Sequence, residues 1–546
     1  MLDIDWKEKA KKLLKAEMAE KQVSNAELVE MLNRIGVPET KASVDSKISR
    51  GSFSAAFLIQ CLNVMGFSSF LPEVAGSLKI TGQETNLNNM TPIARKSTTN
   101  GINFIDLFAG IGGLRLGFER AFAELGITTK CVLTSEIKSH ALEVLYKNFP
   151  HDNVVGDITN VKSNSIPDFD FLLAGFPCQP FSAGGKRQGF ADTRGTLFFE
   201  IERILADKQP YGFVLENVEG IVKHDLENKN DKIGRTLHTI LERLTGLGYK
   251  VSWKVLNAAD FDLPQARKRI FIVGTRDRSI DLESFSASRK KLNSILQKDL
   301  PKLETKFTKL LLEHFSIDDL HGKAIKDKRG GDENIHSWDI ELKGPVSEEQ
   351  CEILNKLLKE RRKKHWAEQI GIIWMDGMTL TLDQIRTFHD SPQLKEMLDD
   401  LVDKGYLRFE YPKSIHSEQT EMGTRTYRVK NPSLLPGYNI VSGKLSFEIN
   451  KILDPNDIAP TLVATDMARL AIPDGKGLRR MSVREGLRMF GFPEEFEMPI
   501  NTDEAFDVLG NTVAVNVVTA VAKRLATTYS SAMRLTQTRS RPVAFL

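Results

Sequence analysis

The sequence contains few cysteines, and none of them is spaced to bind a metal. The four cysteines among 546 residues, Cys61, Cys131, Cys178 and Cys351, form no Cys-x-x-Cys pair. A structural zinc site and a disulfide framework are therefore disfavoured, and a reducing compartment is indicated. We accordingly expect a cytoplasmic protein without a metal centre.

Long apolar runs and a strong excess of one charge are also missing. No apolar run approaches the roughly 18 residues of a membrane-spanning helix, and residues 1–9 lack the pattern of a signal peptide. We expect no contact with a membrane. Lys and Arg number 75 against 72 Asp and Glu, so the net charge is only +3. Global charge therefore does not indicate a nucleic-acid partner, which would need local basic surfaces.

The pattern of the sequence changes along its length, beginning with a helical segment. Residues 1–75 predict an N-terminal helical domain with short helices, one of which begins at the capping box Ser24-Asn25-Ala26-Glu27. The expected helices cover 6–20, 24–35, 40–49 and 53–64. This arrangement resembles a repressor-type helix-turn-helix, and a plain docking domain explains it equally well. Residues 76–100, rich in Thr, Asn, Ser and Gly, predict a linker.

From residue 101 to 276, strand-like apolar runs alternate with helical segments. The strand-like runs are Phe104–Leu107, Lys130–Leu133, Phe171–Leu173, Phe213–Leu215 and Ile270–Val273. Such alternation predicts a doubly wound α/β fold with a mostly parallel sheet. Longer helices, charge and scattered aromatics replace it over 277–470. There, Leu380–Phe409 predicts two helices and a short strand, as in a winged-helix-like insert. Residues 529–546 predict a basic, disordered tail.

The first predicted strand is followed by a glycine-rich turn. Residues 104–114 read as a strand, then Ala109-Gly110-Ile111-Gly112-Gly113, then the start of a helix. Glycines let backbone N–H groups approach a ligand, and the binding sites for NAD, FAD and S-adenosylmethionine all use such a glycine-rich turn. Glu136 and Asp157 end the next two strands, where carboxylates suit ribose hydroxyls and an adenine amino group. Either acid alone could equally be a helix cap or a solvated charge.

A cysteine between two prolines follows a later strand. Phe176-Pro177-Cys178-Gln179-Pro180 comes after the apolar run 169–173, and Glu216-Asn217-Val218 follows the next strand. Because proline cannot continue a helix or donate to a sheet ladder, Cys178 is expected on a stiff loop at the mouth of the sheet. A thiolate and a nearby carboxyl suit attack on an electron-poor ring with proton donation to it.

Two arginines further along are expected near the same place. Arg267 and Arg269 alternate along a strand, so we expect their guanidinium groups on one face, beside Cys178 and Glu216. An exposed stripe of ion pairs is the alternative interpretation.

Together these motifs resemble those of the cytosine-C5 DNA methyltransferases of bacterial restriction–modification systems. The resemblance covers about 103–276 and 471–528. In the family's order it includes Asp106–Gly113, Glu136, Asp157, Pro177-Cys178-Gln179, Arg194–Phe198, Glu216-Asn217-Val218, Gln265–Arg269, Arg479–Glu485, Gly491–Pro493 and Gly510–Val513. Asp262 and Ile137 depart from the family, which often has Gly and an aromatic residue at these places.

The resemblance implies a fold and a division into domains. The fold is a Rossmann-like S-adenosylmethionine-dependent methyltransferase core with a mostly parallel sheet, an inserted target-recognition domain and an N-terminal all-α domain. Residues 101–276 and 471–528 would form the catalytic core, and 277–470 the target-recognition region.

The resemblance also assigns roles to residues. Cys178, Glu216, Arg267 and Arg269 are implied to be catalytic. The residues implied to bind S-adenosylmethionine are Phe108, Ala109, Gly110, Gly112, Gly113, Leu114, Glu136, Ile137, Asp157, Ile158, Pro177, Leu197, Asn511 and Val513. The candidate DNA contacts are Arg361, Arg362, Lys363, Lys364, Arg425, Arg428, Thr461 and Leu462. The basic run 361–364 has a plainer interpretation as a solvated helix face.

The implied reaction is methyl transfer to C5 of a cytosine that has left the duplex stack, with Cys178 adding to C6 and Glu216 supplying a proton. Double-stranded DNA is the implied partner, read as a short sequence by a monomer, and a cognate restriction endonuclease would be a genetic partner only. Two other classes stay open. A tRNA cytosine-C5 methyltransferase shares the motifs, although the long recognition region argues against it. A non-enzymatic DNA-binding regulator is disfavoured by the intact catalytic motifs.

Overall fold

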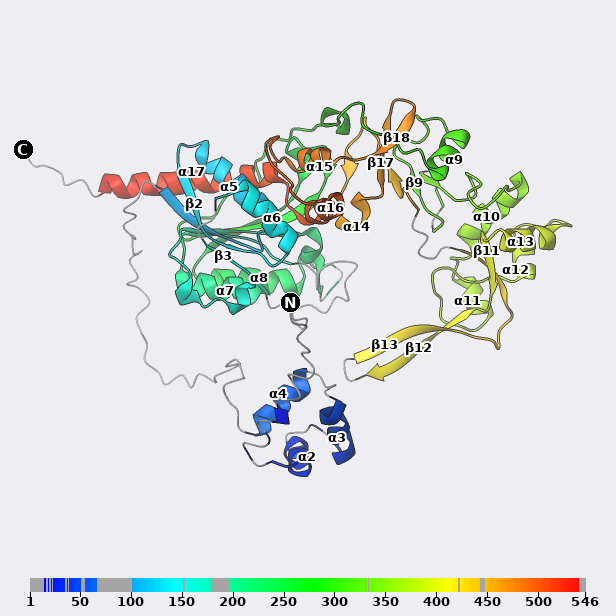
Figure 1. Cartoon of the computed structure of the whole chain (residues 1–546), viewed down its shortest axis with the longest axis horizontal. Helices are drawn as coiled ribbons and strands as arrows, with labels where there is room; N and C mark the ends of the chain where they lie inside the picture. Colours follow the sequence, from blue (N-terminus) through cyan, green and yellow to red (C-terminus); the bar gives the residue numbers. More distant parts are fainter. Residues whose placement is uncertain are drawn as a thin grey trace, which may run out of the picture. The chain divides into compact units, whose positions relative to one another are not determined.

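The structure is a computed structural model of the chain, and it describes parts of residues 14–65 and most of 101–539 (Figure 1). The segments outside the described residues are 1–13, 16–17, 19–20, 22, 35–36, 38, 51–54, 66–100, 151–152, 178–196, 227, 229, 329, 332, 421–422, 442–446 and 540–546. The chain divides into two compact units, 1–96 and 97–546. Each unit is described by itself.

The described residues of the first unit include three helices of ten residues each. They are α2 (Asn25–Arg34), α3 (Lys41–Arg50) and α4 (Ala55–Val64). The predicted capping box is present, because the Ser24 N–H donates to Glu27 Oε2 over 2.8 Å and the Glu27 N–H donates to Ser24 Oγ over 3.3 Å. Leu28, Leu32, Val44 and Ile48 help to form a shared apolar core. The helix expected over 6–20 and the linker lie largely outside the described residues.

The second unit is built on a seven-stranded sheet in the order β3-β2-β1-β4-β5-β8-β6 (Figure 1). The strands are β1 (Gly101–Leu107), β2 (Thr128–Ser135), β3 (Val154–Val155), β4 (Phe171–Gly175), β5 (Gly212–Val218), β6 (Lys250–Asn257) and β8 (Lys268–Thr275). The five strands β3, β2, β1, β4 and β5 are parallel to one another, whereas β8 is antiparallel to its neighbours β5 and β6. The predicted mostly parallel sheet is confirmed.

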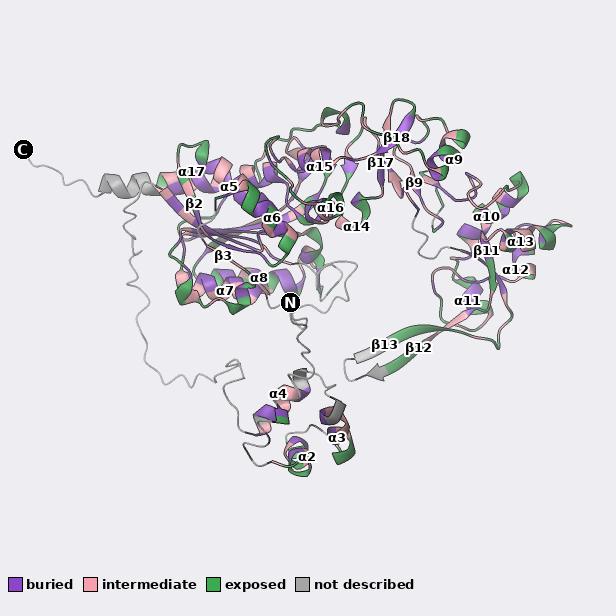
Figure 2. Cartoon of the chain, viewed as in Figure 1, coloured by how far each residue is buried: buried purple, intermediate pink, exposed green. Residues whose placement is uncertain are grey.

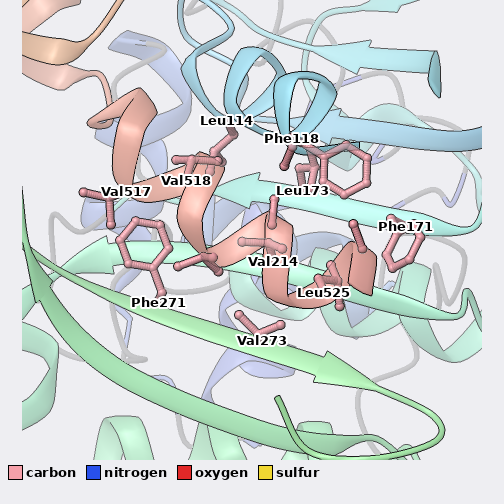
Figure 3. Packing of buried hydrophobic residues seen from close by; sticks show 14 of the residues in the cluster. Leu114, Phe118, Phe171, Leu173, Val214, Phe271, Val273, Val517, Val518 and Leu525 are labelled. Atoms are coloured by element: carbon pink, nitrogen blue, oxygen red, sulfur yellow. The ribbon is translucent and has the colours of Figure 1, made fainter. Parts of the chain in front are cut away.

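Helices cover both faces of this sheet. On one face lie α5 (Gly113–Ala123) and α17 (Val515–Arg539), and on the other α7 (Leu197–Lys208) and α8 (Arg235–Gly246). Figure 3 shows Val517, Val518 and Leu525 of α17 packed among apolar side chains of α5 and the strands. A Cβ on Gly117 would lie 2.6 Å from Val518 Cβ, so α5 and α17 pack closely. The end of the chain therefore completes the core begun at β1. The α6 helix (Ser139–Asn148) follows β2.

The long helix α17 corrects one expectation about the end of the chain. A disordered tail was expected from residue 529, but α17 continues to Arg539. Tyr529 is buried, with its ring 5.5 Å from that of Phe171 and 5.0 Å from that of Tyr211. Residues 502–532 contain an 18-residue window that is apolar enough to cross a membrane by length and composition, yet 72% of that window is buried. This packing identifies a core helix.

The inserted region has two parts, and the first is tied to the core. It contains α9 (Lys306–His314) and a sheet in the order β10 (Asn334–Ile335), β9 (Ala324–Ile325), β15 (Lys451–Ile452), β17 (Leu470–Asp474) and β18 (Gly477–Arg480). Because this sheet joins strands from both sides of residue 470, the domain boundary expected there runs through one sheet. The β16 strand (Ala459–Pro460) pairs with β7 (Gln265–Ala266) of the core. The helices α14 (Ala464–Met467), α15 (Val483–Phe490) and α16 (Thr502–Asn511) follow.

The second part of the insertion has its own apolar core. Its helices are α10 (Glu348–Glu360), α11 (His365–Gln369), α12 (Leu382–Arg386) and α13 (Leu394–Asp403), and its strands are β11 (Leu407–Glu410), β12 (Lys413–Thr420), β13 (Gly423–Lys430) and β14 (Gly437–Ile440). The two helices and short strand predicted over 380–409 are present as α12, α13 and β11. Most of the described side chains of the β12–β13 hairpin are exposed (Figure 2).

Candidate active site

The sheet changes winding direction between β1 and β4. From β1 the chain passes to β2 and β3 on one side, and then returns to β4 and β5 on the other. In open α/β sheets, ligands bind outside the carboxyl ends of the strands at such a switch point. The glycine-rich turn after β1 and the Pro177 segment after β4 both begin there, which explains why distant sequence motifs meet.

The glycine-rich turn has the backbone that its composition predicts. Phe108, Gly110 and Gly112 have φ values of 56°, 55° and 82°, in the left-handed region that favours glycine. A Cβ at Gly112 would lie 2.4 Å from the ring of Phe149, whereas one at Gly110 would meet nothing within 4 Å. Gly112 is therefore required by packing, and Gly110 borders open space.

Glu136 and Ile137 lie directly after β2. The Glu136 carboxylate accepts hydrogen bonds from the Gly110 N–H over 2.7 Å and from the Ile137 and Lys138 N–H groups over 2.8 Å each. It therefore ties the glycine-rich turn to the end of β2. Ile137 is 74% exposed although it is apolar. An exposed aliphatic side chain beside this carboxylate offers a surface for a flat ring.

Asp157 and Ile158 follow β3. Asp157 caps a short 3-10 helix, because its Oδ1 accepts from the N–H and the hydroxyl of Thr159. Asp157 is therefore a helix cap, which was the alternative interpretation of this acid, and its side chain is exposed. The side chain of Ile158 is only 1% exposed and packs in the core, so only its backbone faces the edge of the sheet.

Residues from the end of the chain reach the same turn. A Cβ on Gly113 would lie 2.9 Å from Thr512 Oγ1 and 2.9 Å from Val513 Cγ2. Asn511 is exposed beside them and donates to the Asp507 carbonyl over 2.8 Å. Leu114 lies against Gly175, since a Cβ there would be 3.6 Å from Leu114 Cδ1. The segment 511–513 thus joins the turn as expected.

The end of β5 holds the segment that leads to the cysteine. The Asn217 side chain donates to the Phe176 carbonyl over 3.1 Å, and its own oxygen accepts from the Val218 N–H. Pro177 therefore leaves β4 in a fixed direction beside Glu216. Cys178 itself lies outside the described residues, and Leu197 begins α7 directly after that segment.

Glu216 forms the acidic centre of the site. In the sheet, Glu216 lies opposite Gly175 of β4 on one side and Phe271 of β8 on the other. Because β8 is antiparallel to β5, the start of β8 lies at the carboxyl end of β5, and Arg269 Nε is 3.2 Å from Glu216 Oε1. Burial raises the pKa of Glu216, while the charges of Arg269 and Arg267 act in the opposite direction. A buried carboxyl with a raised pKa is suited to donate a proton.

Arg267 differs from the sequence prediction. It falls between β7 and β8, so the two arginines do not alternate along one strand. Its guanidinium donates to the carbonyls of Leu462 (2.9 Å), Gly510 (3.1 Å) and Thr512 (2.7 Å), and it lies over the Phe490 ring. The expectation that both guanidinium groups lie on one face of a single strand is therefore wrong, although the charge of Arg267 still acts on Glu216. Arg267 joins three chain segments, and Arg269 is the arginine in contact with Glu216.

The predicted DNA contacts Thr461 and Leu462 lie close to this arginine. The Leu462 side chain is 2% exposed and packs in the core, which excludes a side-chain contact with DNA. Thr461 is exposed, and its hydroxyl donates to the Ala266 carbonyl over 2.5 Å. Val463, the residue after Leu462, is 40% exposed, and it was not among the predicted DNA contacts.

The basic run 361–364 is not a free helix face. Arg361 is buried and donates to the Ile440 carbonyl over 3.2 Å, and burial lowers its pKa. Arg362 pairs with Asp376 over 2.8 Å, Lys363 with Glu360 over 2.6 Å, and Lys364 lies over the Trp374 ring. The prediction of a phosphate contact is wrong for Arg361, because the α10 helix ends at Glu360 and the chain turns into the core.

Arg361→Ala is accordingly expected to destabilise the protein rather than to weaken DNA binding specifically. The change removes a buried donor and leaves a cavity beside Gly377. The free energy of unfolding, measured in denaturant, should therefore fall by about 2–4 kcal/mol. The matched variant Lys363→Ala alters an exposed side chain and should shift stability by no more than about 0.5 kcal/mol. A stable Arg361→Ala variant with reduced DNA affinity would restore the phosphate role.

Sequence reasoning gave no role to two buried polar residues. Asn217 stands in the quoted Glu-Asn-Val motif, which is the signal by which it could have been found. Asp106 of β1 is fully buried, and neither carboxyl oxygen has a hydrogen-bond partner among the described residues. Burial raises the pKa of Asp106 to about 8.

These features define a class of protein, an α/β enzyme whose ligand-binding turn and acid–base groups converge on the switch point of one sheet. Within that class, the chain belongs to the family of C-5 cytosine-specific DNA methylases, which its residues 102–527 match. It is a DNA (cytosine-5-)-methyltransferase of the restriction–modification type, as the motifs predicted.

The chain aligns with curated relatives over nearly the whole length of those proteins. The chain is 57% identical over 424 residues to the Type II methyltransferase M.NlaIV of Neisseria lactamica, covering 78% of this chain and 98% of that protein. It is 40% identical over 451 residues to M.BanI of Aneurinibacillus aneurinilyticus, covering 78% and 95%. The solved Dnmt2 methyltransferase of S. pombe is 14% identical with a TM-score of 0.43, covering 79% and 99%. Residues 6–70 match a domain of unknown function, DUF6471.

Proposed function

We propose that the chain transfers a methyl group from S-adenosylmethionine to C5 of a flipped cytosine in a short duplex DNA sequence, with Cys178 as nucleophile. The observation that carries this proposal is the Glu216–Arg269 contact at the sheet edge where Pro177 leads into Cys178. Family membership favours DNA over tRNA as the substrate, and it disfavours a purely regulatory role.

The residues at the switch point fit the cofactor. Gly110 borders open space, the Glu136 carboxylate lies at the end of β2, and the Ile137 side chain is exposed. Glu136 would accept hydrogen bonds from ribose hydroxyls, and Ile137 would pack against the adenine. When bound, the cofactor supplies a methyl group on a sulfonium. The predicted residues from Phe108 to Leu114, with Asn511 and Val513, would enclose it.

The roles of the protein groups follow from the chemistry of cytosine. The Cys178 thiolate forms a bond to C6, and Glu216 gives a proton to N3, which makes C5 electron-rich. C5 then accepts the methyl group, with a neutral thioether as the leaving group. A base takes the C5 proton, the bond from sulfur to C6 breaks, N3 returns its proton to Glu216, and the aromatic ring returns. Arg269 would hold the base or orient Glu216, and Arg267 would position the segments around them.

Removal of the Arg269 charge is expected to move the alkaline limb of the pH profile upward. Glu216 must be protonated to donate, so activity is lost as the pH rises through its raised pKa. Arg269 lowers that pKa, and Arg269→Gln therefore raises it further and shifts the fall of kcat/KM to higher pH. The neighbouring exposed lysine provides a control, Lys268→Gln, which should leave the limb in place. A downward shift would contradict proton donation by Glu216.

Bisulfite sequencing of DNA from cells that express the chain tests the proposed function. It should reveal one short motif methylated at cytosine C5, with no such motif in cells that carry the empty vector. We place the enzyme in the cytoplasm as a monomer that methylates each strand in separate events, and a cognate endonuclease is a genetic partner only. Methylation of tRNA without methylation of DNA would overturn the proposal.

The N-terminal unit is proposed to be a separate helical domain that catalysis does not require. Every catalytic motif lies in 97–546, which forms a compact unit of its own. A chain that lacks residues 1–75 is therefore expected to methylate the same motif, as bisulfite sequencing would show. If the unit is a helix-turn-helix, the isolated fragment binds DNA in a low-salt shift assay. Complete loss of methylation in the truncated chain would contradict this separation.

A further inference from the structure

The β12–β13 hairpin is a two-stranded ribbon without a third strand among the described residues. Its register runs from Lys413 opposite Lys430 to Thr420 opposite Gly423. Eight residues in each strand give a length of about 26 Å at 3.3 Å per residue. The described side chains at 416–418 and 426–430 are exposed (Figure 2). Since an isolated hairpin is only marginally stable in water, an exposed ribbon of this length fits a surface that a partner covers.

The two faces of the ribbon differ in charge. Residues directly opposite each other in an antiparallel pair share a face. One face, here called the basic face, carries the described residues Lys413, Ile415, Ser417, Thr426, Arg428 and Lys430, with no carboxylate among them. The other carries Ser414, His416, Glu418, Tyr427 and Val429, and the rings of His416 and Tyr427 stack 6.0 Å apart. Only the basic face therefore matches a polyanion.

Two of the three cations of the basic face, Arg428 and Lys430, are available for a partner. Lys413 Nζ is 3.9 Å from Glu410 at the base of the ribbon. Within the part of the chain that the structure describes, neither Arg428 nor Lys430 forms an ion pair, and both are exposed. The hydroxyl groups of Ser417 and Thr426 lie on the same face, one step beyond Arg428 toward the tip of the ribbon, and can donate to or accept from base edges.

The helix that precedes the ribbon has the opposite charge. The sequence LKEMLDDLVD of α13 contains four carboxylates and one amine. Lys395 pairs with Asp399, and Asp400 is bridged by Lys404 over 2.6 Å, so the few cations near the helix are already used. In a winged helix this element would occupy a DNA groove, but here repulsion from the phosphates opposes such docking.

We propose that the ribbon, rather than helix α13, enters the major groove of DNA with its basic face toward the bases. This inference rests on the proposed function, because it takes duplex DNA as the partner. A major groove about 12 Å wide admits a two-stranded ribbon, and an arginine pairs well with the edge of guanine. Arg428 would read a base, and Lys413 and Lys430 would contact phosphates. Arg425, the other predicted contact, lies opposite Glu418 in register, and its side chain is outside the described residues.

The test compares two exposed arginines of the same insertion in the full chain, Arg428→Ala on the ribbon and Arg386→Ala on α12. Binding is measured by gel shift on a duplex with the methylated motif and on a scrambled duplex. We expect Arg428→Ala to reduce the discrimination between the two duplexes about 5- to 150-fold, as for one lost bidentate base contact. Arg386→Ala should change it less than two-fold. Lys430→Ala should weaken both duplexes alike and lower the salt slope by about one.

Several results would overturn the inference. If Arg428→Ala and Arg386→Ala reduced the discrimination between the two duplexes equally, the helices would be the elements in the groove. If Arg428→Ala left the discrimination unchanged, the ribbon would not lie in the groove. A dimer that dissociates in the Arg428→Ala variant would show that a second copy covers the ribbon. If the wild-type chain methylates no motif, the proposed function fails separately, and Lys430→Ala on sheared genomic DNA still tests the ribbon through its salt slope.

Discussion

Replacement of Cys178 by alanine is expected to reduce methyl transfer by at least about 10⁴-fold while DNA binding stays within a few-fold of wild type. The thiolate is the only group proposed to form a bond to the base, and loss of a nucleophile removes the covalent route entirely. Transfer of labelled methyl groups to duplex DNA measures the rate, and a gel shift measures binding.

A half-buried thiol elsewhere in the chain, Cys351, serves as the control for this variant. Cys351 lies on α10 in the inserted region, far along the chain from the catalytic motifs. Cys351→Ala should retain nearly full activity. If Cys178→Ala kept more than a few per cent of the wild-type rate, the cysteine would not be the nucleophile.

Glu216→Gln is expected to slow turnover by about 10²- to 10⁴-fold, the usual contribution of a general acid. Glutamine keeps the size of the side chain and its place on β5, but it cannot supply the proton. Binding of S-adenosylmethionine, followed by calorimetry, should change little, because the glycine-rich turn and Glu136 are untouched.

Glu219→Gln provides a matched control for this prediction. Glu219 follows β5 by one residue, and its side chain is 53% exposed with a lysine 3.8 Å away. Its activity should remain at the wild-type level. A Glu216→Gln variant that retained turnover within a few-fold would make this carboxyl structural and would require another proton donor.

The core of the fold could be predicted from the sequence because its signals are local. Apolar runs such as Phe171–Leu173 and Phe213–Leu215 lie in buried strands, and the glycine-rich turn lies directly after β1. The antiparallel direction of β8 and the continuation of α17 past Tyr529 could not be predicted in this way. The direction of β8 depends on its pairing with β5 and β6, and α17 packs on residues such as Phe171 that lie hundreds of residues earlier. Neither interaction leaves a periodic pattern in the segment itself.

Charged residues in the candidate sites were predicted less well, for a physical reason. Composition shows that Arg267 and Arg361 are cations, but it does not show that backbone carbonyls take up their N–H groups. Both side chains are buried because the chain folds around them, and their neighbours come from distant segments. Arg269 was placed correctly because its partner, Glu216, lies on the adjacent strand.

The most direct test of the account is a covalent adduct with DNA that carries 5-fluorocytosine at the methylated position. Release of the base requires loss of a proton from C5, and fluorine blocks that step after the sulfur has bonded to C6. The wild-type chain with S-adenosylmethionine should form a denaturation-resistant complex in which mass spectrometry locates the base on Cys178, and Cys178→Ala should form none. Absence of the adduct in the active wild-type enzyme, or attachment to another residue, would contradict the proposed mechanism.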